Sequence, residues 1–302
     1  METYWRNVAP TSLVCYNMDM DNKYEILKDL KALIEESEDS IDDIAKRAGV
    51  SSRTIDNILS GNVTPNNDIV DKIYSCAYDD GYRFNKIKEE IYKETYNGKV
   101  LFHGASKMIN EIRHDGSRDN CDFGNGFYLG ETYSQASSFV YDVPFSSVYA
   151  FTMDLNGLKV IEFETDIEWM LLVCYYRKMI NEYAKNTKIV ALLNKIKDAD
   201  VIIAPIADNK MFNIMRQFGD GDITTVQAIH SLAASGLGKQ FVLKTSKAIS
   251  HLTQVERLFL SSSERKAIST LMEDRGREID TKLKLSKREF RGKGQYIDEL
   301  FK

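Results

Sequence analysis

Two short stretches carry residue types that suit a ligand pocket. Segment 99–104, KVLFHG, is an apolar run that ends in His103 and Gly104, and segment 123–130, FGNGFYLG, is a glycine-rich turn that leads to Tyr128. A histidine at a strand end can bond a sugar hydroxyl, and a glycine beside it lets backbone groups approach a ligand. A tyrosine ring can stack on a flat cation. Together these residues indicate a pocket for a flat cationic ring joined to a sugar.

The ligand that such a pocket fits is NAD, used as a substrate. An enzyme that breaks the nicotinamide–ribose bond has to hold a flat cationic ring and stabilise the positive charge that develops on the sugar. Tyr128 offers one aromatic face, and Phe139, in an expected helix over 131–142, offers a second. Arg118 precedes the tyrosine strand and can meet the pyrophosphate, whereas Asp122 is expected to cap the turn.

This ordered set resembles the ADP-ribosyltransferase superfamily of diphtheria-like toxins and poly(ADP-ribose) polymerases, and more narrowly a bacterial family of uncharacterised domains within it. The resemblance covers roughly residues 99–250. It implies that His103 and Gly104 bind the NAD ribose and carboxamide. It also implies that the strand GFYLG, which begins at Gly126, presents Tyr128 for stacking; leucine follows the tyrosine where the family has Phe, Ile or Val.

The same resemblance assigns three further positions. Ser134 stands at the spacing of a serine that contacts the carboxamide, and Phe139 stands where the second stacking residue is usually tyrosine. Gln240, in the segment GKQFVLKT, occupies the place of a glutamate on a late strand. An amide can hydrogen-bond but carries no charge, so the resemblance implies transfer of single ADP-ribose units at most. Glu131 is the nearest alternative carboxylate.

Residues 23–80 resemble a repressor-type helix-turn-helix. Ser40 and Asp43 fit a capping box, Gly49 permits a tight turn, and a second helix follows. That helix would read DNA or contact a protein partner through five residues: Ser51, Ser52, Arg53, Thr54 and Asn57. Residues 23–94 contain 11 Lys and Arg against 16 Asp and Glu, which is a net charge of −5. Phosphate binding depends on cations, so DNA and a protein partner both stay open.

The whole chain has 302 residues, 43% hydrophobic residues and a formal charge of −5, which excludes a strongly basic nucleic-acid binder. We expect an α+β protein with three parts: an all-α helix-turn-helix bundle over 1–95, an ADP-ribosyltransferase-like split β-sheet domain with flanking helices over 96–250, and a helical C-terminal extension over 251–302. Strands are expected at 99–104, 126–130 and around 240, and an apolar-rich helix around 168–176 is expected in the core.

The four cysteines are scattered without a CxxC pair, so we expect no metal site and a reduced, cytoplasmic setting. No run of about 20 apolar residues occurs, so no membrane partner is expected.

Three functions follow. The first is a mono-ADP-ribosyltransferase with catalytic residues His103, Tyr128 and Gln240, acting as an intracellular bacterial toxin or defence effector; its acceptor would be a protein, a nucleic acid or a small molecule. The second is a catalytically degenerate sensor of NAD or a related nucleotide. The third is a transcription regulator whose C-terminal part is scaffold. A cognate antitoxin and a homodimer are possible partners.

Overall fold

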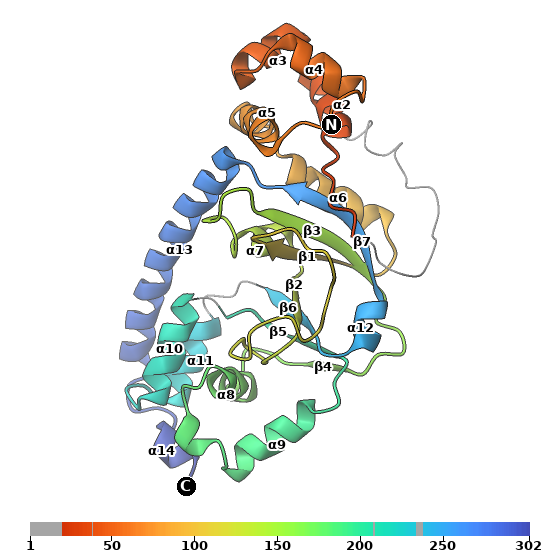
Figure 1. Ribbon diagram of the computed structural model, residues 1–302. Coiled ribbons are helices and arrows are strands. Elements are labelled where there is room, and N and C mark those ends of the chain that lie inside the picture. Colours follow the sequence, from red (N-terminus) through yellow and green to blue (C-terminus); the bar gives the residue numbers. More distant parts are fainter. Residues whose placement is uncertain (1–19, 38, 208, 234–237) are drawn as a thin grey trace. The chain divides into compact units, whose positions relative to one another are not determined.

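The computed structural model describes residues 20–37, 39–207, 209–233 and 238–302. It is an α+β protein, as expected: helices come first, strands and helices follow, and helices end the chain (Figure 1). The chain divides into two compact units, each assembled from separate segments. Unit 1 comprises residues up to 111, 132–154 and 252–270; unit 2 comprises residues 112–131, 155–251 and 271–302.

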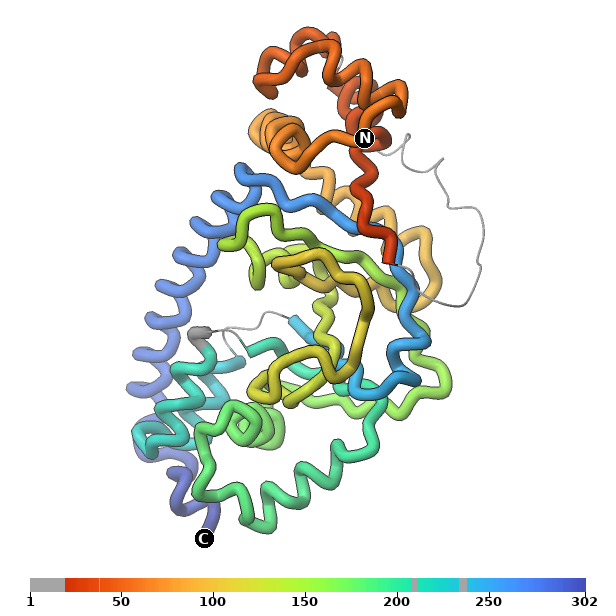
Figure 2. Tube along the Cα trace, in the orientation of Figure 1, coloured from red at the N-terminus to blue at the C-terminus, as the bar shows by residue number. Residues whose placement is uncertain are grey.

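The N-terminal helices of unit 1 include one, α3, that begins and ends at the residues expected from the sequence. Ser40 caps α3 and forms a capping box with Asp43, and Gly49 ends the helix with a φ of 65° in the left-handed region, where glycine adds no steric strain. An apolar core formed by residues such as Leu30, Ile44 and Ile55 holds the helices together. These helices (red and orange in Figure 2) are α2 (Ile26–Ser37), α3 (Ile41–Ala48), α4 (Ser52–Leu59), α5 (Asn67–Asp79) and α6 (Phe84–Thr95).

Three antiparallel strands complete unit 1 in the order β1-β3-β7. They are β1 (Lys99–Ala105), β3 (Ser147–Met153) and β7 (Leu252–Phe259). The short helix α7 (Tyr133–Ser137) packs on the face of β1 that carries Phe102, together with Val148 and Leu258. The strand expected at 99–104 is therefore confirmed.

The C-terminal segment is only partly helical, so the expectation of a helical extension over 251–302 is wrong for β7. This strand contains a β-bulge, which makes it hard to predict from the sequence. Ala150 of β3 pairs with Glu256 while Phe151 pairs with Gln254, so Val255 is an extra residue in β7. A bulge interrupts the alternation by which a strand is recognised. The rest is helical as expected, in α13 (Ser262–Glu289) and α14 (Ile297–Leu300).

Four strands of unit 2 lie in the order β4-β5-β6-β2. The β4–β5 pair is parallel, whereas β5–β6 and β6–β2 are antiparallel. In the last pair Tyr128 lies opposite Val242, and Gly130 lies opposite Gln240. The strands are β2 (Phe127–Gly130), β4 (Val160–Glu162), β5 (Val201–Pro205) and β6 (Lys239–Leu243).

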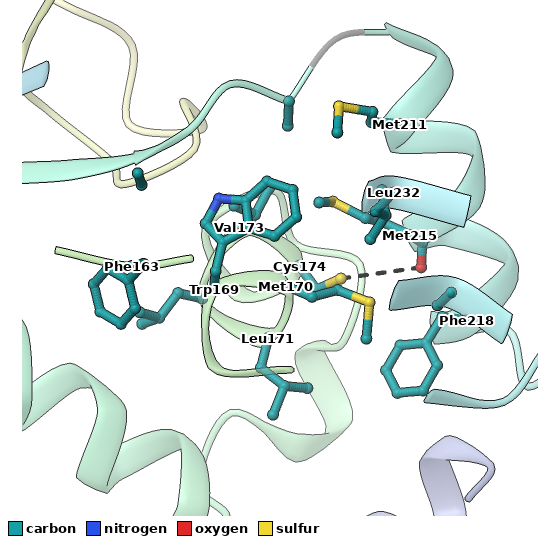
Figure 3. Close-up of a cluster of buried hydrophobic side chains, with 14 of the residues drawn as sticks. Phe163, Trp169, Met170, Leu171, Val173, Cys174, Met211, Met215, Phe218 and Leu232 are labelled. Atoms are coloured by element: carbon teal, nitrogen blue, oxygen red, sulfur yellow. Dashed lines mark hydrogen bonds between the residues drawn. The ribbon is translucent and has the colours of Figure 1, made fainter. Parts of the chain in front are cut away.

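The core of unit 2 forms around α8 (Ile167–Tyr176), which is buried continuously from Trp169 to Cys174. A helix that is apolar on every side belongs inside a protein, and the core position expected for this segment is confirmed. Figure 3 shows its side chains against Met215 and Leu232, which come from α10 and α11, with the Cys174 thiol 4.0 Å from the Met215 carbonyl oxygen. The remaining helices are η1 (Asn181–Tyr183), α9 (Thr187–Ile196), α10 (Asn209–Gly219), α11 (Thr225–Ala233) and α12 (Ser246–Ser250).

Among the described residues, no helix combines the length and the apolar composition needed to cross a membrane.

Candidate functional site

His103 lies in β1, one residue before Gly104, and is half-buried. It is directly opposite Tyr149 of β3, and paired residues of an antiparallel sheet share one face. On that face the Tyr149 hydroxyl donates to the Asn22 side chain and accepts a bond of 3.1 Å from the Ile109 amide. His103 therefore faces the side of β1 on which residues 22 and 109 lie.

Gly104 has a packing role. A Cβ atom at this position would lie 2.2 Å from the Ala136 carbonyl oxygen, which is far inside van der Waals contact. The backbone of α7 therefore lies directly on β1, and only glycine permits this approach. This requirement accounts for a glycine here whether or not a ligand also uses its backbone.

Ser134 and Phe139 belong to the α7 region. The expected helix over 131–142 is shorter than predicted, because α7 ends at Ser137. The Ser137 and Ser138 hydroxyls bond back to carbonyl oxygens at 134 and 135, over 3.2 and 2.7 Å, and such local bonds compete with helix continuation. Phe139 consequently lies in a turn, with its side chain 58% exposed.

Ser134 is exposed on α7. Because α7 packs on the Phe102 face of β1 and side chains alternate along a strand, His103 and α7 lie on opposite faces of that strand. Unit 1 thus does not bring His103, Ser134 and Phe139 together on one face.

The glycine-rich turn of unit 2 is fixed by close packing. Gly124 has a φ of 68°, and a Cβ there would lie 2.8 Å from the Tyr176 ring. A Cβ on Gly126 would lie 2.5 Å from the Val242 side chain. Gly124 thus lets the turn lie against α8, Gly126 lets it lie against β6, and the next residues form β2 as expected.

Tyr128 follows this turn with its ring held in place. Its hydroxyl donates to the Gly124 carbonyl oxygen over 2.6 Å and accepts a bond of 3.1 Å from the Phe123 amide. Burial raises the pKa of the Tyr128 phenol far above its ordinary value, so the hydroxyl stays protonated. The chain's own turn therefore sets the orientation of the ring.

Gln240 lies beside Tyr128 in the same sheet. Since Tyr128 is opposite Val242 and Gln240 is opposite Gly130, the two side chains are diagonal neighbours on one face. Such neighbours are about 7–8 Å apart. Gly130, directly opposite Gln240, has no side chain to fill that space.

The Gln240 amide belongs to a buried polar cluster that also contains Asp122 and Arg177. Its nitrogen donates to Asp122 Oδ2 over 2.9 Å and to the Pro205 carbonyl oxygen over 3.0 Å. Arg177 donates to Asp122 Oδ1 from Nε and Nη2, over 3.0 and 2.6 Å. Gln240 is 6% exposed and Asp122 is 4% exposed.

The expectation that Asp122 caps the turn is therefore wrong: its carboxylate bonds to distant residues instead. Sequence reasoning also missed Arg177, the residue that follows α8. Its guanidinium lies 4.0 Å from the centre of the Phe212 ring, and a cation suits the carbonyl end of a helix. The available signal was an arginine directly after an apolar-rich helix.

Lys244 is a second residue that sequence reasoning missed. Its ammonium donates to the Phe123 carbonyl oxygen over 2.6 Å and to that of Asn125, so it fastens the glycine-rich turn. Burial lowers the pKa of Lys244 to about 8. Glu131 accepts a bond of 3.1 Å from the Lys239 amide, and Arg118 is exposed in the loop before the turn.

The predicted contact helix, α4, uses much of its polar surface internally. The Ser51 hydroxyl caps α4 by accepting from the Thr54 amide over 3.1 Å and lies 2.8 Å from the Thr54 hydroxyl. Ser52 donates to Asp42. Arg53 is exposed and Asn57 is half-buried. Of the five predicted contact residues, Ser51, Ser52 and Thr54 therefore already have partners within the helical bundle.

Within the described part of the chain, no group of three or more His, Cys, Asp or Glu side chains could hold a metal ion. Residues 99–254 match the model of a family described as a protein of unknown function (DUF3990). The match begins with β1 and ends inside β7, so it contains every residue of the predicted pocket. No curated protein and no solved structure matches the chain.

Proposed function

Since the chain belongs to a family of proteins of unknown function (DUF3990), its activity has to be inferred from its residues, and we propose that it is an NAD-dependent mono-ADP-ribosyltransferase. The observation that carries this proposal is the β2–β6 pairing, in which an orientationally fixed Tyr128 ring and the Gln240 amide are diagonal neighbours beside a glycine. An aromatic ring next to a hydrogen-bonding amide suits a flat cation attached to a ribose.

In the proposed reaction, the bond between the nicotinamide nitrogen and the ribose C1′ breaks, and its electron pair leaves with nicotinamide. The acceptor then attacks C1′ and loses a proton. Tyr128 stacks on nicotinamide, and His103 bonds a ribose hydroxyl. Gln240 orients the 2′-hydroxyl, and Arg118 binds the pyrophosphate.

The absence of charge on Gln240 determines how fast we expect the reaction to be. The nearby Asp122 carboxylate is already paired with Arg177, and an amide adds no charge of its own. Stabilisation of the positive sugar is consequently weaker than a free carboxylate would give. We therefore propose slow transfer of single units and no chain elongation.

The same observation favours one alternative, a protein that senses NAD without consuming it. A pocket in which the Asp122 carboxylate is neutralised by Arg177 retains hydrogen-bonding capacity but has less capacity to stabilise a developing cation. Under this alternative the helical bundle would transmit the NAD-bound state to a partner.

Nicotinamide release from NAD tests the proposal. The wild type, His103→Ala, Gln240→Ala and a control, Glu168→Gln, are incubated with NAD. Glu168 forms an exposed ion pair with Lys195, so its replacement should leave release unchanged. Release that both pocket variants lose supports the transferase. NAD binding that His103→Ala loses, without any release, supports the sensor, and neither release nor binding contradicts both.

For the N-terminal helices we propose a protein partner, such as an antitoxin or a second copy of the chain, in preference to DNA. The net charge of −5 over residues 23–94 and the internal bonds of Ser51, Ser52 and Thr54 support this choice. Duplex binding measured against salt concentration tests it: affinity that falls steeply with added salt would indicate phosphate contacts. A protein-binding bundle shows negligible duplex affinity even at low salt.

A further inference from the structure

We propose that Asp122 is a positioning residue that fixes Gln240 as a hydrogen-bond acceptor toward the ligand, so that the ligand group meeting position 240 must be a donor. This inference rests on the proposed binding of NAD, whose ribose hydroxyls are donors of that kind. It assigns the specificity of the site to a residue 118 positions away from Gln240 in the chain.

The chemistry of the neighbours dictates the orientation of the amide. The Pro205 carbonyl oxygen is an acceptor only, and an ionised Asp122 carboxylate is an acceptor only. Both lie within 3.0 Å of the Gln240 nitrogen. The flipped amide would direct its oxygen at two acceptors and lose both bonds. The nitrogen is therefore held inside the protein, and the carbonyl oxygen is the part of the side chain that can serve a ligand.

Arg177 stabilises the buried Asp122 carboxylate. A buried carboxylate without a partner is costly, but Arg177 donates two bonds to Oδ1 and leaves Oδ2 for Gln240. Arg177 and Gln240 therefore both donate hydrogen bonds to Asp122, which only accepts. An asparagine at position 122 would instead place a donor toward Gln240.

A glutamate at position 240 would conflict with this cluster. In Gln240→Glu, the introduced carboxyl faces the Asp122 carboxylate and the Pro205 oxygen, so its pKa in the folded protein is raised. A carboxyl whose pKa is raised by folding reduces stability as the pH rises past its unfolded value of about 4.3. The variant should come closest to the wild type near pH 4, where the introduced group is protonated and its single O–H replaces one of the two bonds that the amide donates.

The first experiment measures melting temperature between pH 4 and pH 8 for four proteins: the wild type, Gln240→Glu, the double variant Asp122→Asn/Gln240→Glu, and the control Glu168→Gln. Relative to the wild type, Gln240→Glu should lose about 2–4 °C as the pH rises. The double variant should recover part of that loss, because the introduced amide at 122 accepts from Arg177 and donates to the introduced carboxyl. Pro205 remains unfavourable, so recovery is incomplete. The control should follow the wild type.

The second experiment measures the dissociation constants of NAD and of its analogue with fluorine in place of the 2′-hydroxyl on the nicotinamide ribose. The wild type should bind NAD about tenfold more tightly than the analogue, because fluorine cannot donate. Asp122→Asn presents a donor to the Gln240 oxygen while Pro205 still accepts from the Gln240 nitrogen, so the amide divides between two orientations and its nitrogen faces the ligand in one of them. This variant should reduce the ratio of the two constants toward one.

The two experiments distinguish a failure of the proposed function from a failure of the role of Asp122. A wild type that binds no NAD contradicts the proposed function, while the melting temperatures still test the role of Asp122. A pH profile of Gln240→Glu that follows the wild type, or a double variant with no recovery, overturns the positioning role even if NAD binds. An unchanged ratio of constants in Asp122→Asn overturns the acceptor role.

Discussion

Lys88 offers a quantitative test of how unit 1 is held together. The side chain lies on α6 and is 2% exposed. Its ammonium donates to Asp29 of α2 over 2.7 Å and to Glu256 of β7. Burial alone would lower the pKa of Lys88, but the two carboxylates outweigh burial and raise it. The lysine is therefore a buried cation shared between two buried carboxylates.

The change to test is Lys88→Met, which keeps the length of the side chain and removes the charge. Breaking a buried ion pair from one side costs about 3–5 kcal/mol, and two carboxylates are left here. Burial already raises the pKa of Asp29, while Lys88 opposes that rise, so removing the lysine raises it further. A carboxyl with a raised folded pKa reduces stability as the pH increases past about 3.9. The deficit should therefore be largest at pH 7 and smaller at pH 4.

Urea unfolding followed by circular dichroism measures the free energy of unfolding at both pH values. Hydrogen exchange of peptides covering α6 and β7 assigns the change to unit 1. The control is Lys93→Met on the same helix, where the ammonium is 2.5 Å from Glu89 but the side chain is 43% exposed. Since the Lys93 ammonium is open to solvent and Glu89 keeps its bond from the Tyr133 amide, this change should cost at most about 1 kcal/mol. A Lys88→Met loss no greater than that of the control, or one that does not change with pH, would refute the reasoning.

Three further predictions concern single positions. Gly104→Ala should lower the free energy of unfolding by about 1–3 kcal/mol, because its Cβ would lie 2.2 Å from the Ala136 oxygen. Thermal unfolding measures this loss, with Gly116→Ala as the control, since the nearest atom there is 3.6 Å away. Equal losses in the two variants would contradict the packing role. Ser40→Ala removes the α3 capping box and should lose about 1 kcal/mol; an unchanged urea midpoint would contradict the cap. The amine of Lys244 should react with an acylating reagent with a midpoint near pH 8, and a midpoint at the ordinary lysine value would contradict its burial.

The elements that local chemistry determines could be predicted from the sequence. The capping box at Ser40, the left-handed Gly49, the strand that contains Gly104 and the strand that begins after Gly126 all depend on residues within a few positions. The apolar helix α8 was recognisable for the same reason, since six consecutive buried residues need no distant partner to identify them.

The features that depend on distant partners could not be predicted. The strand β7 is hard to predict because the bulge at Val255 interrupts its alternation, and that bulge is defined only by the pairing of β7 with β3. Asp122 lies in a stretch that is typical of a turn, and its partners are 55 and 118 positions away. Nothing near it in sequence distinguishes a turn cap from the carboxylate at the centre of a buried cluster. The helix expected around Phe139 ends earlier, where the Ser137 and Ser138 hydroxyls bond to the backbone of α7. Serine also occurs inside helices, so its presence in the sequence does not predict this end.

The position of β7 has a consequence for how the protein is made. Lys88 and Glu256 are 168 positions apart, and the strand that carries Glu256 is synthesised after residues 112–131 and 155–251 of unit 2. During synthesis Lys88 can already pair with Asp29, but its second carboxylate, Glu256, is absent until β7 has left the ribosome. Domains generally fold as units as the chain emerges, but unit 1 lacks its third strand until residues 155–251 of unit 2 have been made. A nascent chain stalled anywhere before β7 would leave β3 as an unpaired edge strand, and such an edge can pair with other chains.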